Sequence, residues 1–459
     1  MISHFLFYDW NNRRFSSDWF MRRLRYGCLM ERRVVPVLVV MFMLTSGCMS
    51  EPPDLDGDGI PDGEDSDIDG DGWGNDVESN CSTDQLISSS VPLDTDGDFV
   101  CDFIDSDDDG DLWGDFTELD CSTDPLDNLS TPEDYDGDMI CDSLDLDADG
   151  DGLPNSWEQL RGLDYLDSQD YITCHGMSEY CMRTYDDFTF AESHNSFSTP
   201  EDGIIAGINH LTGLQSQWDD GIRAFMLDPY HPSEMESEKE DVVFCHALSL
   251  PNTPPCLFGS VDAFEWLRSL NSLHNNSSGD VVSLLIQNYR VPGDHLEYLL
   301  NETGILERAY IHELGTPWPS IGDMSLSRTD VVIFIEMEYE GNFSKLLPAW
   351  KHSWDTPYGE SNQDEMTCEV GRGDVNQPVW HLNNWLSTFG LSDSAKAAQV
   401  NDYEVLLDRA LLCWETVGNR PTFIGVDYWE QGEVTNVTRT LNSMSGWSDD
   451  VPSHPSSET

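Results

Sequence analysis

The chain has 459 residues and a formal net charge of −65, with 87 Asp and Glu against 22 Lys and Arg. This length allows two or three domains. Such an acidic chain argues against nucleic acid as a partner, because the phosphate backbone binds basic patches. The charge is densest in residues 51–160, which hold 37 Asp and Glu and no Lys or Arg. This segment must stay disordered or be neutralised by cations, because its charges repel one another and few apolar residues oppose them.

Residues 1–48 predict an export signal, with Met30 as the expected start. After Met30, arginines precede a short apolar run and then small residues before Cys48. The run is too short to span a bilayer comfortably, which favours a cleaved signal over a membrane helix. The sequence TSGC resembles the lipobox of prokaryotic lipoproteins, except that Thr45 stands where an aliphatic residue is usual. The resemblance implies a lipid anchor at Cys48 on the cell surface; secretion without a lipid is the alternative.

The remaining cysteines agree with export. Of the 12 cysteines, all but Cys28 and Cys48 can pair, and an even number behind a signal peptide indicates disulfides formed outside the cytoplasm. The connectivity stays open at this point. Four cysteines are spaced by twenty residues, and the rest form plausible neighbouring pairs: Cys81, Cys101, Cys121 and Cys141, then Cys174/Cys181, Cys245/Cys256 and Cys368/Cys413.

Residues 54–158 form an internal repeat with an offset of 40 residues. Similar acidic segments begin at Asp54, Asp94 and Asp134, and the connectors between them repeat as well. A fixed period is typical of stacked units. In the spacing D-x-D-G-D, alternate aspartates can converge on one cation while the glycine permits a tight turn. Carboxylates in this number suit a hard cation with oxygen ligands, and Ca²⁺ fits better than a transition metal.

This region resembles the thrombospondin type 3 repeats, whose motif is DxDxDGxxDxxD. The resemblance implies a calcium-bound, disulfide-stapled stalk that lacks a conventional hydrophobic core. A disordered acidic spacer is the alternative. The predicted calcium ligands are Asp54, Asp56, Asp58, Asp62 and Asp65, then Asp94, Asp96, Asp98, Asp102 and Asp105, and finally Asp134, Asp136, Asp138, Asp142 and Asp145.

From about residue 175 to residue 440, apolar strand-like runs alternate with amphipathic helical patterns. This alternation predicts a parallel α/β sheet, and the length suits a closed (β/α)8 barrel of the TIM type. A doubly wound open sheet is less favoured, because no GxGxxG follows the first strand. The expected strands are 188–193, 222–228, 242–248, 281–287, 331–337 and 422–428; the expected helices are 203–218, 261–273 and 403–417; residues 441–459 are expected to form a flexible tail.

Polar residues end several of these strands, where a barrel places its site. His194 and Asn195 follow the first strand, and His246 ends the third. Two histidines from different strands suit a two-step acid–base reaction, in which one takes a proton from an attacking hydroxyl and the other protonates the leaving oxygen. Asp228, Gln287 and Asp427 end further strands of the set.

Residues 184–430 resemble the X domain of phosphatidylinositol-specific phospholipase C and its wider family of barrel phosphodiesterases. The matching stretches are SHNSF, DDGIRAFMLDPY, VVFCHAL, VVSLLIQNY and FIGVDYW, and they are closest to a secreted branch of the family. The resemblance implies a phosphoric diester hydrolase in which His194 is the general base and His246 the general acid. The products would be a cyclic phosphate and a diacylglycerol-like alcohol. Asn195 and Asp228 would hold a Ca²⁺ ion against the phosphate, and Asp427 would orient one imidazole.

The chain departs from the family at the metal. Met226 and Gln287 replace two carboxylates of the calcium-dependent members, and no arginine replaces Asp228 as in the calcium-free members. Arg223 should face away from Asp228 because side chains alternate along a strand. Arg290 could supply a phosphate ligand, but a surface arginine is the favoured alternative. Glu336 and Glu338 could replace a missing carboxylate, although ion pairs are favoured, and His210, His231 and His274 are expected to be exposed.

Two functions remain on the sequence alone. The first is an exported phosphodiesterase that acts on a phospholipid or another phosphodiester with a neighbouring hydroxyl. The second is a catalytically impaired, calcium-dependent adhesion or binding protein at the cell surface. The paired histidines favour the first and the replacements at Met226 and Gln287 favour the second, while the head group stays open.

Overall fold

The computed structural model describes residues 52–232, 238–246, 256–388 and 390–452. The predicted signal peptide, with Met30 and Cys48, lies outside these described residues. The chain divides into two compact units, Met1–Asp108 and Asp109–Thr459. Within the described ranges, no helix combines the length and apolar character that crossing a membrane requires.

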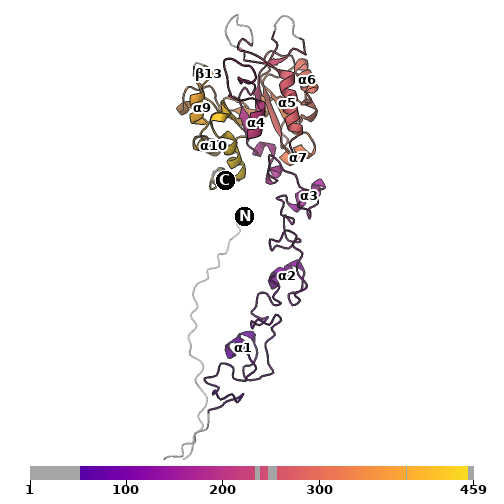
Figure 1. The fold of residues 1–459 in the computed structure, drawn as a ribbon, viewed down its shortest axis with the longest axis vertical. Helices are drawn as coiled ribbons and strands as arrows, with labels where there is room; N and C mark the ends of the chain where they lie inside the picture. Colours follow the sequence, from indigo (N-terminus) through magenta and orange to yellow (C-terminus); the bar gives the residue numbers. More distant parts are fainter. Residues whose placement is uncertain (1–51, 233–237, 247–255, 389, 453–459) are drawn as a thin grey trace, which may run out of the picture. The chain divides into compact units, whose positions relative to one another are not determined.

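Each acidic repeat is a loop that leads into a short helix (Figure 1). The helices are α1 (Asn75–Cys81), α2 (Asp115–Cys121) and α3 (Asn155–Arg161), and each ends at a residue in the left-handed conformation. Disulfides Cys81–Cys101 and Cys121–Cys141 connect each of the first two helices to the following acidic loop. In the described part of residues 52–158, the buried large apolar side chains apart from cystines are only Trp73, Trp113 and Leu153.

The remainder of the chain is built on a curled nine-stranded sheet. All strands but β10 run parallel to their neighbours, and β10 is an antiparallel edge strand. The order is β10 (Arg372–Gly373), β9 (Ser353–Asp355), β11 (Val379–Asn384), β14 (Phe423–Val426), β1 (Phe190–Ser193), β2 (Ala224–Leu227), β6 (Val282–Ile286), β7 (Val331–Ile335) and β8 (Leu347–Pro348).

The prediction of a closed barrel with 242–248 as its third strand was wrong in two respects. Among the described strands, pairing runs from β10 to β8 and does not join these two ends. The third predicted strand forms β4 (Val243–Phe244), which pairs instead with β3 (Pro229–Tyr230) and β5 (Val261–Asp262) in a separate antiparallel sheet. The reason is that β6 pairs directly with β2, which leaves β4 no place beside it.

Helices cover one face of the sheet, which we call the outer face. Apolar residues of α4 (Leu214–Asp220), α5 (Ala263–Asn275), α6 (Gly293–Glu302), α10 (Tyr403–Val417) and α11 (Val434–Ser443) pack there against alternate strand residues. The other alternate residues form a second, inner cluster that includes Phe190, Met226, Leu285, Phe334 and Phe423. Strand alternation therefore places the inner-face side chains at the carboxyl ends of the strands around one space.

Several boundaries differ from the prediction. Helix α10 matches the predicted helix 403–417. The predicted helix 203–218 is helical only where it overlaps α4, because Gly203 and Gly207 adopt positive φ values of 89° and 68°. The tail boundary at 441 falls inside α11, whose Leu441 is buried. The remaining described α-helices are α7 (Ile321–Leu326), α8 (Ala349–His352) and α9 (Ser394–Val400), and the remaining strands are β12 (Ser387–Thr388) and β13 (Leu391–Ser392).

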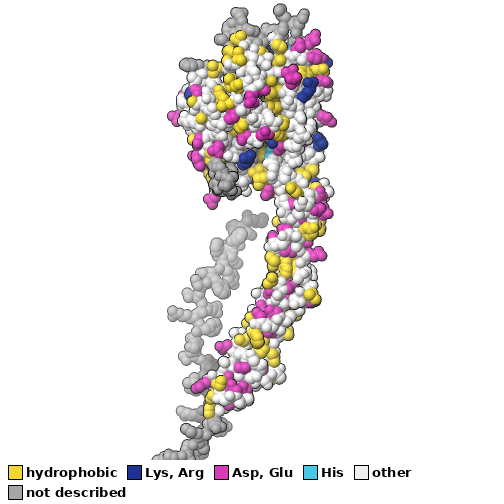
Figure 2. Space-filling view, viewed as in Figure 1, with side chains coloured by type: hydrophobic (Ala, Val, Ile, Leu, Met, Phe, Trp, Pro, Cys, Tyr) yellow, Lys and Arg dark blue, Asp and Glu magenta, His cyan; other side chains and the backbone are white. Residues whose placement is uncertain are grey.

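The predicted neighbouring cysteine pairs are confirmed in the second unit: Cys174–Cys181, Cys245–Cys256 and Cys368–Cys413. Figure 2 shows Asp and Glu side chains scattered over the face in view, with few Lys and Arg between them. Disulfides are typical of proteins that fold outside the cytoplasm.

Candidate active site

His194 follows β1 and is held on both ring nitrogens. Its Nδ1 lies 2.9 Å from Oδ1 of Asp427, and its Nε2 lies 3.0 Å from Nδ2 of Asn195. Trp385 stacks on the imidazole, with 4.1 Å between ring centroids and 9° between planes. Asn195 has a φ of 51°, a left-handed conformation that asparagine tolerates better than most residues. Asp427 therefore favours the tautomer with hydrogen on Nδ1, which leaves Nε2 as the basic nitrogen.

Polar groups from other segments surround His194 and Asp427. Asn209 donates from Nδ2 to Oδ1 of Asp427 at 2.7 Å and to Oγ of Ser392 at 2.8 Å. The Nε2 atom of His210 lies 2.8 Å from the backbone carbonyl oxygen of His194. Sequence motifs did not indicate Asn209, Ser392 or Trp385, because their roles arise from contacts between distant segments.

His246 follows β4 and faces Asp228. Its Nε2 lies 3.8 Å from Oδ2 of Asp228, and 29% of its side chain is exposed to solvent. The backbone N–H of Cys245 donates to the carbonyl oxygen of Asp228 at 3.1 Å, and the Cys245–Cys256 disulfide fixes the same segment. These contacts bring His246 to the end of β2 although β4 lies outside the main sheet.

The pKa values of the two imidazoles are shifted in opposite directions. Burial lowers the pKa of His194, but the charge and hydrogen bond of Asp427 raise it more, so it lies above its ordinary value. Burial, with the positive charge of His194, lowers the pKa of His246 to about 4. The free site therefore keeps a proton on His194 to higher pH than on His246. The two rings lie close enough for the charge of one to act on the other.

Asp228 also titrates abnormally. Burial raises its pKa to about 7, with the charge of His194 opposing this rise and that of Glu336 adding to it. By contrast, the pKa of Asp427 is lowered, because His194 and Asn209 together outweigh the opposing effect of burial. Asp427 is therefore the permanent anion of the site, while Asp228 changes charge near neutral pH.

The predicted barrel metal site offers few donors. Asn195 Oδ1 and Asp228 Oδ1 are buried without a hydrogen-bond partner and could face a cation. Calcium takes six to eight oxygen ligands. Met226 supplies no oxygen, and the amide of Gln287 donates to Oε1 of Glu336 at 3.3 Å. These residues fit a resident Ca²⁺ ion poorly, and Asp228 fits better as the partner of His246.

Arg372 is a cation at the inner face that the sequence analysis missed. Its guanidinium lies 2.6 Å from Oδ2 of Asp355 and 2.9 Å from Oε1 of Glu336, between the rings of Trp350 and Tyr358. Glu336 is thus an ion-pair partner, which was one of the predicted alternatives, as is Glu338, whose carboxylate lies 2.7 Å from Nζ of Lys351.

Replacing Arg372 by alanine should destabilise the second unit by about 3–5 kcal/mol, because it leaves two buried carboxylates without a counter-charge. Only 2% of the side chain of Glu336 and 1% of that of Asp355 are exposed. Urea unfolding followed by tryptophan fluorescence measures the loss. Arg372→Lys, which keeps the charge, is the matched control and should lose less; equal stability of Arg372→Ala and the parent would contradict the expectation.

The remaining residues considered in the sequence are two arginines and three histidines. Arg290 is exposed just after β6, and Arg223 points to Asp280, with 3.0 Å between Nε and Oδ2, so it turns away from Asp228 as expected. The prediction of exposure was wrong for His210, His231 and His274, which are all buried. Each is accommodated because it has a polar partner: the carbonyl oxygen of His194, the imidazole of His295, and the carbonyl oxygen of Asp280.

The acidic repeats gather the predicted carboxylates into groups that could hold a cation. Within each group the candidate oxygen atoms lie within 4.8 Å of one another: Asp54, Asp56 and Asp58; Asp94, Asp96 and Asp98; Asp134, Asp136 and Asp138. Both these residues and the later members of each motif accept backbone hydrogen bonds; the later members are Asp62, Asp65, Asp102, Asp105, Asp142 and Asp145.

The structure also shows acidic loops that the sequence analysis did not single out. The sequence pattern D-x-D-x-D-x₆-E begins at Asp67, Asp107 and Asp147 and ends at Glu78, Glu118 and Glu158. All three glutamates are buried at 0% exposure, and neither carboxylate oxygen of any of them has a hydrogen-bond partner. This pattern, typical of EF-hand calcium loops, was the signal that could have identified them.

Known proteins resemble part of this chain. A family profile described as PI-PLC X 1 matches residues 180–442. A "PI-PLC X domain-containing protein 1" from the fungus Arthroderma benhamiae is 25% identical over 300 residues, covering 60% of this chain and 91% of that protein. An "Uncharacterized secreted protein" of the same organism is 24% identical over 307 residues, covering 59% and 64%. Among solved structures, the phosphatidylinositol-specific phospholipase C of Listeria monocytogenes aligns with 11% identity and a TM-score of 0.38, covering 56% of this chain and 94% of that one.

Proposed function

The chain belongs to the PI-PLC X family, and from this premise we propose that it is an exported phosphoric diester hydrolase. It cleaves a phospholipid, or another phosphodiester with a neighbouring hydroxyl, through a cyclic phosphate. The observation that carries the proposal is the pair of imidazoles at one site, His194 held by Asp427 at 2.9 Å and His246 within 3.8 Å of Asp228.

The proposed reaction uses two proton transfers. Nε2 of His194 removes the proton from the hydroxyl next to the phosphate, and that oxygen attacks phosphorus. As the new P–O bond forms, the bond to the lipid-side oxygen breaks, and His246 gives its proton to this leaving oxygen. The products are a cyclic phosphate and an alcohol. Water can then open the ring, with the two histidines exchanging roles.

The electrostatics of the site support binding of an anion before the reaction. In the free site His246 is neutral at pH 7, because its pKa lies at about 4. A phosphate anion beside His246 favours the protonated ring and raises its pKa. The substrate would thus prepare its own general acid, while Asp427 stabilises the imidazolium that forms at His194.

Export and calcium complete the proposal. One relative of the chain is described as secreted, and disulfides occur in both compact units. We expect a lipid anchor at Cys48 to hold the protein at a membrane surface, where the substrate lies. We expect Ca²⁺ in the acidic repeats, because the carboxylate groups gathered there repel one another without cations.

The test is cleavage of defined lipid vesicles followed by ³¹P NMR. Phosphatidylinositol vesicles should give a cyclic phosphate signal before the monoester appears. Phosphatidylcholine, which has no hydroxyl next to its phosphate, should not be cleaved. Cleavage without a cyclic product would contradict the mechanism. Absence of turnover on inositol, glycerol and glycosylated phosphodiesters would contradict the enzyme and favour the calcium-dependent binding protein.

A further inference from the structure

The acidic loop Asp147–Glu158 of the third repeat has the geometry of a cation site. Asp147, Asp149 and Asp151 occupy positions 1, 3 and 5, and Glu158 occupies position 12. Gly152 at position 6 has a φ of 92°, the conformation that allows the sharp turn in such loops. The carboxylates therefore follow the order in which a twelve-residue calcium loop supplies its ligands.

Glu158 is the strongest candidate ligand in this loop. It is fully buried, and neither of its carboxylate oxygens has a hydrogen-bond partner. One oxygen each of Asp147, Asp149 and Asp151 is also buried without a partner. A buried carboxylate among like charges is costly unless a cation lies between them.

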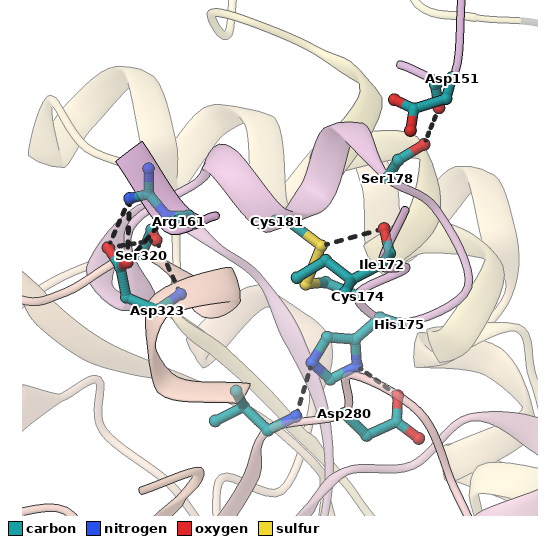
Figure 3. The surroundings of a disulfide bond; sticks show 11 residues. Asp151, Arg161, Ile172, Cys174, His175, Ser178, Cys181, Asp280, Ser320 and Asp323 are labelled. Atoms are coloured by element: carbon teal, nitrogen blue, oxygen red, sulfur yellow. Dashed lines mark hydrogen bonds and ion pairs between the residues drawn. A yellow bond between two sulfur atoms is a disulfide. The ribbon is translucent and has the colours of Figure 1, made fainter. Parts of the chain in front are cut away.

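The loop is packed into the second unit. Leu153, directly after Gly152, is fully buried in the same inner cluster as Tyr180 and Cys181. Figure 3 shows Ser178 donating from Oγ to the backbone carbonyl oxygen of Asp151, at 2.6 Å. The cation loop and the segment that precedes β1 are thus directly joined.

Helix α3, which carries Glu158, contacts the same unit. Arg161 makes two hydrogen bonds to the carboxylate of Asp323 in α7, of 3.0 and 2.9 Å (Figure 3). The ring of Trp157 packs so closely on Gly322 that a Cβ atom there would lie 2.6 Å from it. An ion held by both the loop and Glu158 would therefore fix α3 against the domain.

We propose that Asp147, Asp149, Asp151 and Glu158 bind one calcium ion that is a structural ion of the phosphodiesterase domain. Ca²⁺ suits the site better than Mg²⁺, because the glutamate at position 12 can give both oxygens and Ca²⁺ accepts more oxygen ligands in a less strict geometry. Binding to the folded state alone stabilises it, so calcium controls the stability of the domain that carries His194 and His246. This inference stands whether or not the domain is catalytically active.

The first repeat supplies a matched control. Asp67, Asp69, Asp71 and Glu78 repeat the same pattern, and Glu78 is also fully buried without partners. This loop lies in the other compact unit, Met1–Asp108. Glu78→Gln and Glu158→Gln therefore remove the same charge from equivalent loops, of which only the second is part of the domain.

The experiment compares the full chain and both variants with excess Ca²⁺ and with EGTA. Equilibrium dialysis counts bound calcium, and hydrogen exchange with mass spectrometry follows residues 178–183 and 320–326. Both variants should bind one ion fewer than the parent. Calcium should protect these segments, on the order of tenfold or more, in the parent and in Glu78→Gln, but not in Glu158→Gln.

Three results would overturn the proposal. One is unchanged calcium stoichiometry in Glu158→Gln. Another is equal protection of residues 178–183 in the parent with and without calcium, a measurement that needs no variant and so holds even if Glu158→Gln fails to fold. If Glu78→Gln lost the protection as fully as Glu158→Gln, the ion would not be specific to the domain, which also contradicts the proposal.

Discussion

Replacing either His194 or His246 by alanine should lower kcat/KM for a phospholipid by about 10²–10⁴-fold, the usual contribution of a general acid or base. The two losses should not add in the double variant, because each histidine acts on the same transition state. Vesicle hydrolysis measures the effect. His295→Ala, on α6, is the control; its imidazole contacts His231 and takes no part in the proposed proton transfers.

A change of leaving group separates the two roles. An inositol phosphodiester with a nitrophenyl leaving group needs no proton on the departing oxygen. His246→Ala should therefore recover most of its activity on this substrate, whereas His194→Ala should stay impaired because its base is missing. The opposite pattern would reverse the assignment of acid and base. Equal recovery of both variants would remove general acid–base catalysis from the mechanism.

Strand runs and the histidine motifs were visible in the sequence because both are local signals. The apolar runs at 281–287 and 331–337 contain β6 and β7, and the helical pattern at 403–417 matches α10. The described strands form an open sheet rather than a closed barrel, and this was not visible in the sequence. Whether β4 enters the sheet depends on which strand pairs with β2, and this is decided by contacts between distant segments.

The residues around the histidines were harder to predict for a related reason. Asn209, Trp385 and Arg372 belong to segments with no recognisable motif, and they reach the site through packing across the inner face. Burial of His210 and His274 was missed because a polar side chain is tolerated inside when a backbone carbonyl satisfies it.

The pKa values of the two histidines lie in the reverse of the order that the proposed reaction needs. The reactive form has a neutral His194 and a protonated His246, but the pKa of His194 is raised and that of His246 is about 4. The population of the reactive form is then nearly constant between these two pKa values. This population falls below about pH 4, because the neutral fraction of His194 keeps decreasing while His246 is already protonated. It falls above the pKa of His194, because His246 keeps losing its proton.

Asp427→Asn should lower kcat/KM by about 10²–10⁴-fold and move the upper limb of its pH profile to lower pH. The carboxylate of Asp427 is what raises the pKa of His194 against the effect of burial, so its loss lets burial lower that pKa. An amide can also present its NH₂ to Nδ1 and favour the wrong tautomer of the ring. The profile of kcat/KM against pH measures both effects.

Asp355→Asn is the control for this experiment, since Asp355 is also a buried inner-face carboxylate but is paired with Arg372 rather than with an imidazole. It should leave the position of the upper limb unchanged even if it destabilises the fold. If both variants moved the limb equally, the shift would reflect the general loss of negative charge at the inner face. A limb that stays in place in Asp427→Asn would mean that His194 does not set it, and that the 2.9 Å contact orients the ring without controlling its proton.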